Sequence, residues 1–355
     1  MATPSSALAP AATAVSEISL SDLRWLAFTA SHPEALCFHR PAWTEMIADC
    51  YGYRPFVLAV LGERGNIVAG LPVIEAQGRR RRRWISLPFS DNCQPLLHSP
   101  LEAGKFARAL EEARLEAGVG SLEVRSALVG AEDRQHSDGV SHRAELERDP
   151  DLLFARFHRS QVQRNVRRAE RERAIVVRRA ESAEDLSRSF YRLQVQTRRR
   201  QGMPVQPRRF FEALWSHLLE PGHGYLLLAY SGREPVAGAV FLTGSSTVTY
   251  KYGASDGAFW RQRPNHLLFW SAMREACEQG YRWFEFGRSD LADQGLRNFK
   301  AGWAGEEQPL VYTTLAERAP QPSSGRGLTV ARALIRRTPA WVCRASGELL
   351  YRHAA

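Results

Sequence analysis

Residues 227–242 read LLAYSGREPVAGAVFL, which predicts an apolar strand, a polar turn and a second apolar strand. Residues 58–73 read LAVLGERGNIVAGLPV and repeat that order. The two Val-Ala-Gly triplets, at 68–70 and 236–238, lie 236 − 68 = 168 residues apart. Predicted helices precede each segment, and another predicted strand follows it. The shared context indicates two copies of one α/β domain related by duplication.

The length of the chain, 355 residues, also favours two domains over one. Residues 1–19 are rich in Ala, Pro, Ser and Thr and predict a disordered tail. We expect the first copy to occupy residues 20–149 and the second to occupy 150–318. Residues 319–355 then form a linker and a basic amphipathic segment, which either packs on the protein or lies on an anionic membrane surface.

Composition limits the classes of partner. The formal net charge of +10 suits nucleic acid, a membrane surface or a phosphorylated substrate, although a solvated basic surface would also explain it. The five cysteines are scattered, without metal-ligand spacing, so we expect reduced thiols and no structural metal. No signal peptide or membrane-spanning run is evident. These features favour the cytoplasm, with the inner face of the membrane as a further option.

The stretch 281–303, YRWFEFGRSDLADQGLRNFKAGW, carries the densest group of candidate site residues. Its first six residues alternate aromatic and polar side chains, as in a strand, and Gly287 ends that strand. Polar residues at the end of a strand are well placed to face a cleft. A helix follows, in which Lys300 lies beside the aromatic Phe299 and Trp303. The alternative is a strand, a turn and a helix with solvated charges.

Two polar segments flank the predicted domain boundary. Residues 130–149 predict a loop, and residues 151–173 predict one long basic helix. On that helix, Arg164 and Arg168 could contact phosphates of a nucleotide-linked or lipid-linked precursor, or of tRNA. A solvated helix face explains the same residues equally well.

A strand hairpin with glycine in its return strand resembles the GNAT acyltransferase fold. In that fold a Gly-rich loop at a helix N-terminus holds the pyrophosphate of the acyl donor. The corresponding residues here, 260–266, read WRQRPNH and lack the glycines, and Pro264 has no N–H to donate. Ordinary acetyl-CoA binding is therefore not expected in the second copy.

Four motifs together resemble the FemAB-like aminoacyl/acyl transferases, which include the Fem peptidoglycan bridge enzymes. They are RNVRRA at 164–169, YKYGAS at 250–255, PNHLLFW at 264–270, and FEFGRS at 284–289 with Gly295 and Phe299-Lys300 downstream. The resemblance spans about residues 155–315. It implies twin GNAT domains and transfer of an amino acid from aminoacyl-tRNA to an amine of a cell-wall precursor. The coiled-coil arm of many Fem enzymes is absent, and the strand at 121–125 is the nearest match to their first-domain acidic residue.

The resemblance implies a role for Lys300, and the chemistry of amide formation suggests further candidate residues. Lys300 matches the catalytic lysine and would stabilise the oxyanion of acyl transfer, unless it is a surface lysine whose stem covers aromatic rings. Asp290 or Glu285 could act as a base or anchor the amine. The proposed substrate-binding residues, each with a structural alternative, are Tyr252, Asn265, Arg288 and Trp303 in the second copy, Asp91 and Asn92 in the first, and Arg164 and Arg168.

The leading functional prediction is an N-acyl or aminoacyl transferase that forms an amide on an amine of a cell-envelope precursor, of the peptidoglycan or exopolysaccharide type. Its donor is aminoacyl-tRNA or acyl-CoA, no cofactor or metal is bound, and peripheral membrane contact is an option. One alternative is an acyl-CoA-dependent N-acyltransferase acting on a small molecule. Another is a non-catalytic, basic nucleic-acid-binding protein.

Overall fold

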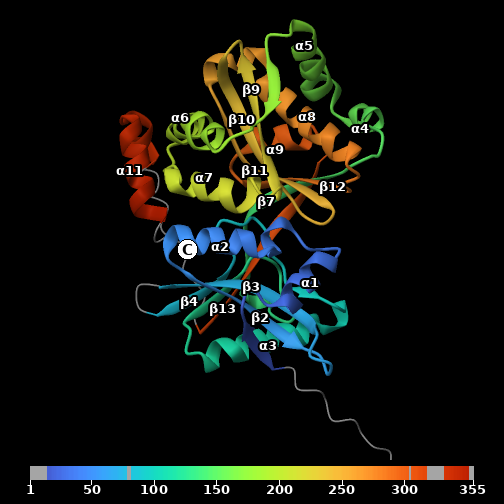
Figure 1. Cartoon of the computed structure of the whole chain (residues 1–355), viewed down its shortest axis with the longest axis vertical. Coiled ribbons are helices and arrows are strands. Elements are labelled where there is room, and N and C mark those ends of the chain that lie inside the picture. The colour runs from blue at the N-terminus through green and yellow to red at the C-terminus, as the bar shows by residue number, and fades with distance from the viewer. Residues whose placement is uncertain (1–13, 78–80, 304, 318–331, 352–355) are drawn as a thin grey trace, which may run out of the picture.

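One continuous mixed sheet runs through the computed structural model, which describes residues 14–77, 81–303, 305–317 and 332–351 (Figure 1). Its strands are β1 (Val15–Ile18), β2 (Arg54–Leu61), β3 (Ile67–Gln77), β4 (Arg82–Ser86), β5 (Leu96–Leu97), β6 (Ser121–Val124), β7 (Gln135–Glu145), β8 (Val176–Arg179), β9 (Gly224–Ser231), β10 (Glu234–Thr243), β11 (Thr247–Ser255), β12 (Trp283–Asp290) and β13 (Glu306–Ala316). Their order across the sheet is β1-β2-β3-β4-β6-β13-β7-β12-β11-β10-β9-β8, and β5 pairs with β3.

The strand pattern occurs twice. In the first half, β2, β3 and β4 form an antiparallel meander, and β4 pairs in parallel with β6. In the second half, β9, β10 and β11 form the same meander, and β11 pairs in parallel with β12. The repeated hairpin in the sequence is therefore the centre of two similar α/β units.

The glycine of each Val-Ala-Gly triplet lies directly against the ring of a buried aromatic residue from elsewhere in the chain. A Cβ atom at Gly70 would lie 2.6 Å from the Trp25 ring, and one at Gly238 would lie 2.8 Å from the Phe190 ring. Glycine inside a strand is unfavourable unless another group approaches the backbone closely. In both halves that group is a buried aromatic side chain, so these glycines report core packing.

Two central strands connect the halves. Strand β7, which precedes residue 150, pairs with β12, whereas β13 pairs with both β7 and β6. The prediction of a loop over 130–149 was wrong for Gln135–Glu145. Its polar sequence, QHSDGVSHRAE, resembles a loop, but its backbone is paired on both sides. The division of the chain at residue 149 remains a prediction.

Helices cover both faces of the second-half sheet (Figure 1). The α-helices of the described residues, from both halves, are α1 (Leu23–Ser31), α2 (Pro41–Tyr51), α3 (Ala103–Glu116), α4 (Pro150–Arg156), α5 (Arg164–Glu172), α6 (Tyr191–Gln201), α7 (Arg208–Leu214), α8 (Pro264–Glu278), α9 (Gln294–Ala301) and α11 (Ala340–Leu350). One core lies between α8, α5 and the sheet. Another lies between the opposite face of the sheet and α7, and includes α2 of the first half, which ties the two halves together.

Three further expectations need correction or limitation. The predicted tail ends earlier, because Val15–Ile18 pairs with β2, and residues 1–13 lie outside the described residues. The predicted helix over 151–173 is broken at His158, whose N–H bonds the Gly302 carbonyl at 2.9 Å. Of the predicted linker and basic segment over 319–355, residues 319–331 lie outside the described residues, whereas residues 332–337 and α11 are helical on either side of Pro339.

Candidate active site

A cavity of about 720 Å³ lies where the ends of β11 and β12 meet residues of the first half and of the C-terminal segment. Its cationic lining residues are Arg198, Lys251, Arg288, Lys300, Arg332 and Arg336, and its acidic lining residues are Asp91, Asp290 and Asp293. The cavity is therefore polar and has more positive than negative side chains.

Two of the three lysines of the chain line this cavity. Lys105 is the third, so the 48 basic residues comprise 3 lysines and 48 − 3 = 45 arginines. Lys251 and Lys300 are buried, whereas Lys105 is exposed. Arginine keeps its charge in proteins, while the pKa of a buried lysine shifts readily. At position 300, the choice of lysine therefore suits chemistry that needs a compact, adjustable cation.

Lys300 projects from α9, and its side chain is only 2% exposed. Its ammonium donates to the carbonyls of Gly287 at 2.7 Å and Arg288 at 2.9 Å. An ammonium has three N–H donors, so one remains for a ligand in the cavity. Burial lowers the pKa of Lys300 to about 8, an effect that the charges of Asp91 and Glu285 partly oppose.

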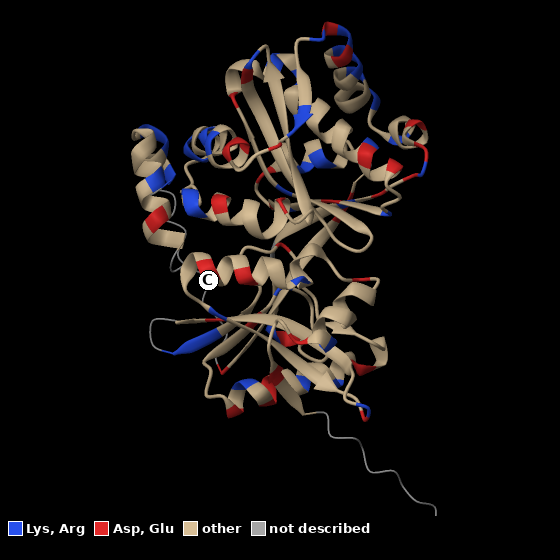
Figure 2. Ribbon diagram, viewed as in Figure 1, with Lys and Arg blue, Asp and Glu red and all other residues tan. Residues whose placement is uncertain are grey.

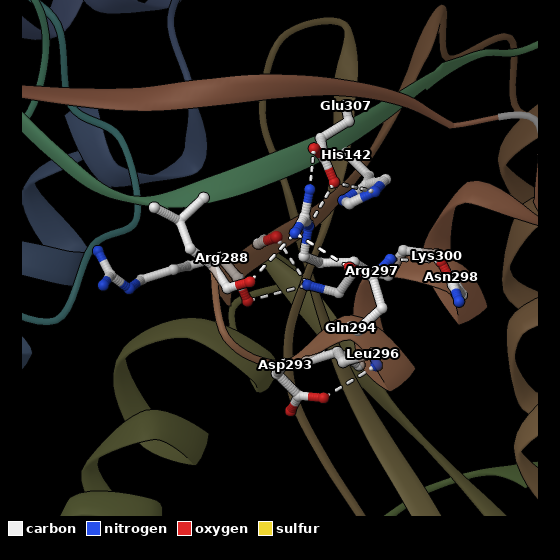
Figure 3. Close-up of polar contacts among 11 residues, drawn as sticks. His142, Arg288, Asp293, Gln294, Leu296, Arg297, Asn298, Lys300 and Glu307 are labelled. Atoms are coloured by element: carbon white, nitrogen blue, oxygen red, sulfur yellow. Dashed lines mark hydrogen bonds and ion pairs between the residues drawn. The ribbon is translucent and has the colours of Figure 1, made fainter.

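Helix α9 is held in place from two sides. The Asp293 carboxylate caps its N-terminus by accepting from the Leu296 N–H at 3.0 Å. Arg297 forms a bidentate ion pair with Glu307 of β13, at 2.8 and 2.7 Å (Figure 3). His142 of β7 lies fully buried with its Nε2 3.3 Å from Glu307. Burial and the Lys300 charge lower the pKa of His142, which favours its neutral form.

Gly287 turns the backbone of β12 toward Lys300. Its φ of +65° lies in the left-handed region, which side chains other than glycine rarely adopt. A Cβ atom there would lie 2.9 Å from the Asp91 carboxylate and 3.1 Å from the Tyr250 carbonyl. Glycine therefore permits both the carbonyl contact with Lys300 and the close approach of Asp91.

Asp91 brings the first half of the chain into the site. Its carboxylate pairs with Lys251 at 3.2 Å, and its carbonyl accepts a hydrogen bond from the Tyr312 hydroxyl at 3.0 Å. The Lys251 ammonium also lies 5.2 Å from the Phe38 ring centroid and 5.6 Å from that of Trp43. Cation–π contacts and the ion pair compensate for its burial.

The cavity also has groups without internal partners. The Tyr252 hydroxyl is buried and has no hydrogen-bond partner among the described residues. Burial raises the pKa of Tyr252 well above its ordinary value, so the hydroxyl remains a donor. Arg198 is half-buried, and no described carboxylate forms an ion pair with Arg198 or Arg332. A bound ligand could satisfy these groups, which is the usual reason for such an arrangement.

Five of the eleven residues predicted for the site line the cavity: Asp91, Tyr252, Arg288, Asp290 and Lys300. Asp290 is exposed and pairs with Arg288 at 3.2 Å. Glu285 does not line the cavity, although burial raises its pKa to about 7, with the Arg143 charge opposing that shift.

Five other predicted residues lie elsewhere. Trp303 is fully buried among aromatic rings of the core, so its prediction as a substrate contact was wrong. Asn265 donates to the Ser255 hydroxyl at 3.4 Å, and Asn92 is not among the lining residues. Arg164 and Arg168 lie on α5 away from the lining, and Arg168 pairs with Glu172, as the solvated-face alternative predicts.

The sequence reasoning missed Lys251, Arg198 and the C-terminal arginines. A shift of register between β10 and β11 leaves Lys251 unpaired between Tyr250 and Tyr252. All three residues line the cavity, which alternation along a regular strand would not allow. The signal for Lys251 was its identity as one of only three lysines. No local signal marks Arg332 or Arg336.

The described residues include no cluster of three His, Cys, Asp or Glu side chains suited to a metal ion. Within the same part of the chain, every helix is too short or too polar to span a bilayer.

The repeated meander, with a parallel strand pair following it in each half, defines a fold of two similar α/β units. Residues 156–301 match the family model described as "Acetyltransferase (GNAT) domain". The second half therefore contains a GNAT acetyltransferase domain, and the chain is an acyltransferase built from two GNAT-like units in tandem. A search of curated proteins finds no match.

Solved structures share this fold. The structure titled "Crystal structure of FemX" aligns with a TM-score of 0.68 and 16% identity, covering 85% of this chain and 97% of that one. The C-terminal domain of a putative lysylphosphatidylglycerol synthetase from Agrobacterium fabrum aligns with a TM-score of 0.54 and 14% identity, covering 88% and 94%. L-PGS from Bacillus licheniformis aligns with a TM-score of 0.55 and 12% identity, covering 90% and 99%. The resemblance to FemAB-like transferases is confirmed for the GNAT domain and the fold.

Proposed function

We propose that this protein transfers an aminoacyl group to an amine of a cell-envelope precursor, in the cavity around Lys300. The observation that carries the proposal is the Lys300 ammonium, buried in the cavity wall and held by two backbone carbonyls at 2.7 and 2.9 Å. Fixed donors of this kind lower the barrier of acyl transfer because they stabilise the charge that develops on the carbonyl oxygen.

The chemistry follows from the third N–H of Lys300. The acceptor amine attacks the carbonyl carbon of the donor ester, and a tetrahedral oxyanion forms beside the ammonium. The C–O bond to the donor hydroxyl then breaks, an amide remains, and the proton lost by the amine passes to the released hydroxyl. With a pKa of about 8, Lys300 is mostly protonated at neutral pH and can act as the electrostatic donor.

The arginine wall supports a phosphate-bearing acceptor. Arg198, Arg332 and Arg336 face the cavity from α6 and from the C-terminal segment, while its acidic residues have partners of their own. Guanidinium groups bind phosphate through paired N–H donors. A nucleotide-linked or lipid-linked precursor carries such phosphates, and its synthesis on the cytoplasmic side would place this protein there.

The N-terminus of α8 supports aminoacyl-tRNA over a CoA thioester as the donor. In GNAT domains that use acyl-CoA as the substrate, the pyrophosphate of acyl-CoA binds at the N-terminus of the helix that corresponds to α8. Here Arg263 occupies the N-cap with φ 59°, and its Nε donates to the Asn165 side chain at 3.0 Å. Pro264 follows it and removes one N–H from the first turn.

Transfer from acyl-CoA to an amine is the second candidate, because the matched family model describes an acetyltransferase domain. Both candidates use the Lys300 cavity. They differ in the leaving group, which is a thiol in one case and a ribose hydroxyl in the other.

Donor binding separates the candidates. We would measure thermal unfolding and calorimetric binding with acetyl-CoA, with a mixture of aminoacyl-tRNAs and with the same tRNAs uncharged, on the wild type and on Lys300→Ala. We expect charged tRNA to bind the wild type more tightly than uncharged tRNA does, and acetyl-CoA to leave the unfolding midpoint unchanged.

Stabilisation by acetyl-CoA alone would establish the second candidate. Equal binding of charged and uncharged tRNA, with no transfer by either protein, would overturn the proposed function. Lys105→Ala is the matched control because it removes the one lysine outside the cavity.

A further inference from the structure

The C-terminal segment, residues 332–351, has an inner face that packs on the protein. Ile335 and the fully buried Cys343 join Val205 in a small core. A side chain at Gly347 would collide with the Val205 carbonyl, so α11 lies directly against this loop. Arg332, Arg336 and Tyr351 line the cavity from the same segment.

The outer face of the segment is apolar and exposed. Trp341 is 63% exposed and Leu349 is 72% exposed, and Ala345 lies midway between them at helical spacing. Leu334, in the helical residues before Pro339, is 61% exposed. Single exposed apolar residues are ordinary, whereas an apolar stripe along a helix that includes tryptophan indicates a contact surface.

Basic residues occur on the segment and on the neighbouring helix α6 (Figure 2). Of the four arginines of the segment, Arg332 and Arg336 line the cavity, whereas the exposed Arg337 and Arg344 do not; the single acidic residue, Glu348, pairs with Arg209. The last turn of α6 adds the exposed Arg199 and Arg200, and Arg199 donates to the Thr338 carbonyl at 2.7 Å. The apolar stripe thus lies beside four exposed arginines, at 199, 200, 337 and 344.

This combination fits an anionic lipid bilayer. Tryptophan and leucine insert at the level of the lipid headgroups, and arginines nearby bind lipid phosphates. A second copy of the chain would bring the same positive charge to the contact, which opposes self-association. We propose that the outer face of residues 332–351 docks the protein on an anionic membrane surface.

The docking is inferred from the exposed apolar and basic residues of the segment and does not depend on the proposed transfer reaction. One consequence rests on the proposed function: because the inner face of the docked segment forms the cavity wall, a lipid-linked acceptor would lie close to the site. The test therefore uses vesicles and no transfer reaction, so its failure leaves the proposed function to be judged separately.

Co-sedimentation with vesicles tests the docking. The full chain is mixed with phosphatidylcholine vesicles or with vesicles that contain about 30% phosphatidylglycerol. We expect at least tenfold tighter binding to the anionic vesicles, and loss of that preference at about 0.5 M salt. The double variant Trp341→Ser/Leu349→Ser should bind the anionic vesicles at least tenfold more weakly than the wild type does. Leu23→Ser/Leu101→Ser is the matched control, because those leucines are 80% and 90% exposed in the first half, and it should bind as the wild type does.

Two further measurements complete the test. Arg337→Glu/Arg344→Glu should abolish the preference for anionic vesicles, with the thermal midpoint unchanged. Brominated lipids should quench more tryptophan fluorescence in the wild type than in Trp341→Phe. The proposal is overturned if the wild type does not bind anionic vesicles, or if the Trp341/Leu349 variant binds them equally well. It is also overturned if the wild type is a dimer that does not bind vesicles and the Trp341/Leu349 variant is a monomer, because the face would then be a contact between two copies.

Discussion

The protonation state of Lys300 determines the expected pH dependence of transfer. Burial lowers the pKa of this ammonium from 10.5 to about 8, so the charged form is lost as pH rises through that value. We predict that the single-turnover transfer rate falls by about tenfold per pH unit above pH 8. A rate that stays constant to pH 10 would show that the charge of Lys300 is not required.

The same shift affects stability in the opposite direction. Between pH 8 and 10.5 the unfolded chain binds more protons at this lysine than the folded chain does, so the free energy of unfolding rises with pH. The contribution is at most about 1.4 kcal/mol per pH unit. Denaturant unfolding at several pH values should show this rise in the wild type and in Lys105→Met. Lys300→Met should lack it, and parallel curves for all three proteins would contradict the shift.

Gly287 provides a second test at the residue scale. Gly287→Ala should destabilise the protein by about 1–3 kcal/mol and displace Asp91. The alanine would be held at a left-handed φ, and its Cβ would lie too close to the Asp91 carboxylate. Gly280→Ala is the matched control, since Gly280 has φ +77° and nothing within 4 Å of the added Cβ. Equal losses of stability and activity in the two variants would show that the Asp91 contact has no role.

Sequence reasoning identified Lys300 and Asp91 but not the partner of Asp91. The motif around Phe299 pointed to Lys300, whereas Lys251 lies at a β-bulge that changes which side chains face the cavity. The spacing that placed Trp303 beside Lys300 was correct, yet its side chain faces the core. A helical period predicts which residues share a face, but not what that face contacts.

Helix α9 shows how one element positions the site. Arg297→Ala removes the bidentate contact with Glu307 of β13, and we expect the transfer rate to fall by about fivefold to tenfold because Lys300 is then less well oriented. The cost in stability should be small, as for other partly exposed ion pairs. Arg168→Ala, which breaks an exposed pair on α5, is the control and should leave the rate unchanged.

Elements with a strong hydrophobic period were predicted well, and polar central elements were not. The meanders around the two Val-Ala-Gly triplets were recognised from the sequence. Strand β7 was not, because its side chains are polar, although its backbone pairs with β12 and β13. Strand pairing of this kind depends on distant partners, which a local pattern does not contain.

In the centre of the sheet, strands of one half pair with strands of the other, and this pairing has a consequence for the whole molecule. Because β7 pairs with β12 and β13 pairs with β6, neither half holds all of its own strands. We predict one cooperative unfolding transition in calorimetry, with equal calorimetric and van't Hoff enthalpies. Two separate transitions would show that the halves fold independently.

The overall architecture was accessible from the sequence because duplication leaves a repeat that can be read directly. The exchange of strands and the closure of the cavity by Arg332, Arg336 and Tyr351 were not, because they join segments far apart in the chain. The site is consequently a property of the assembled chain, with contributions from both halves and from the C-terminal segment.

The most direct test of the central claim is the rate of aminoacyl transfer under single-turnover conditions. The donor is a labelled aminoacyl-tRNA mixture, and the acceptor is a nucleotide-linked cell-wall peptide with a free amine. We predict that Lys300→Ala slows transfer by about 10²–10³-fold, while Lys105→Ala stays within about twofold of the wild type. If Lys300→Ala transfers the aminoacyl group as fast as the wild type does, the cavity around Lys300 is not the site of catalysis.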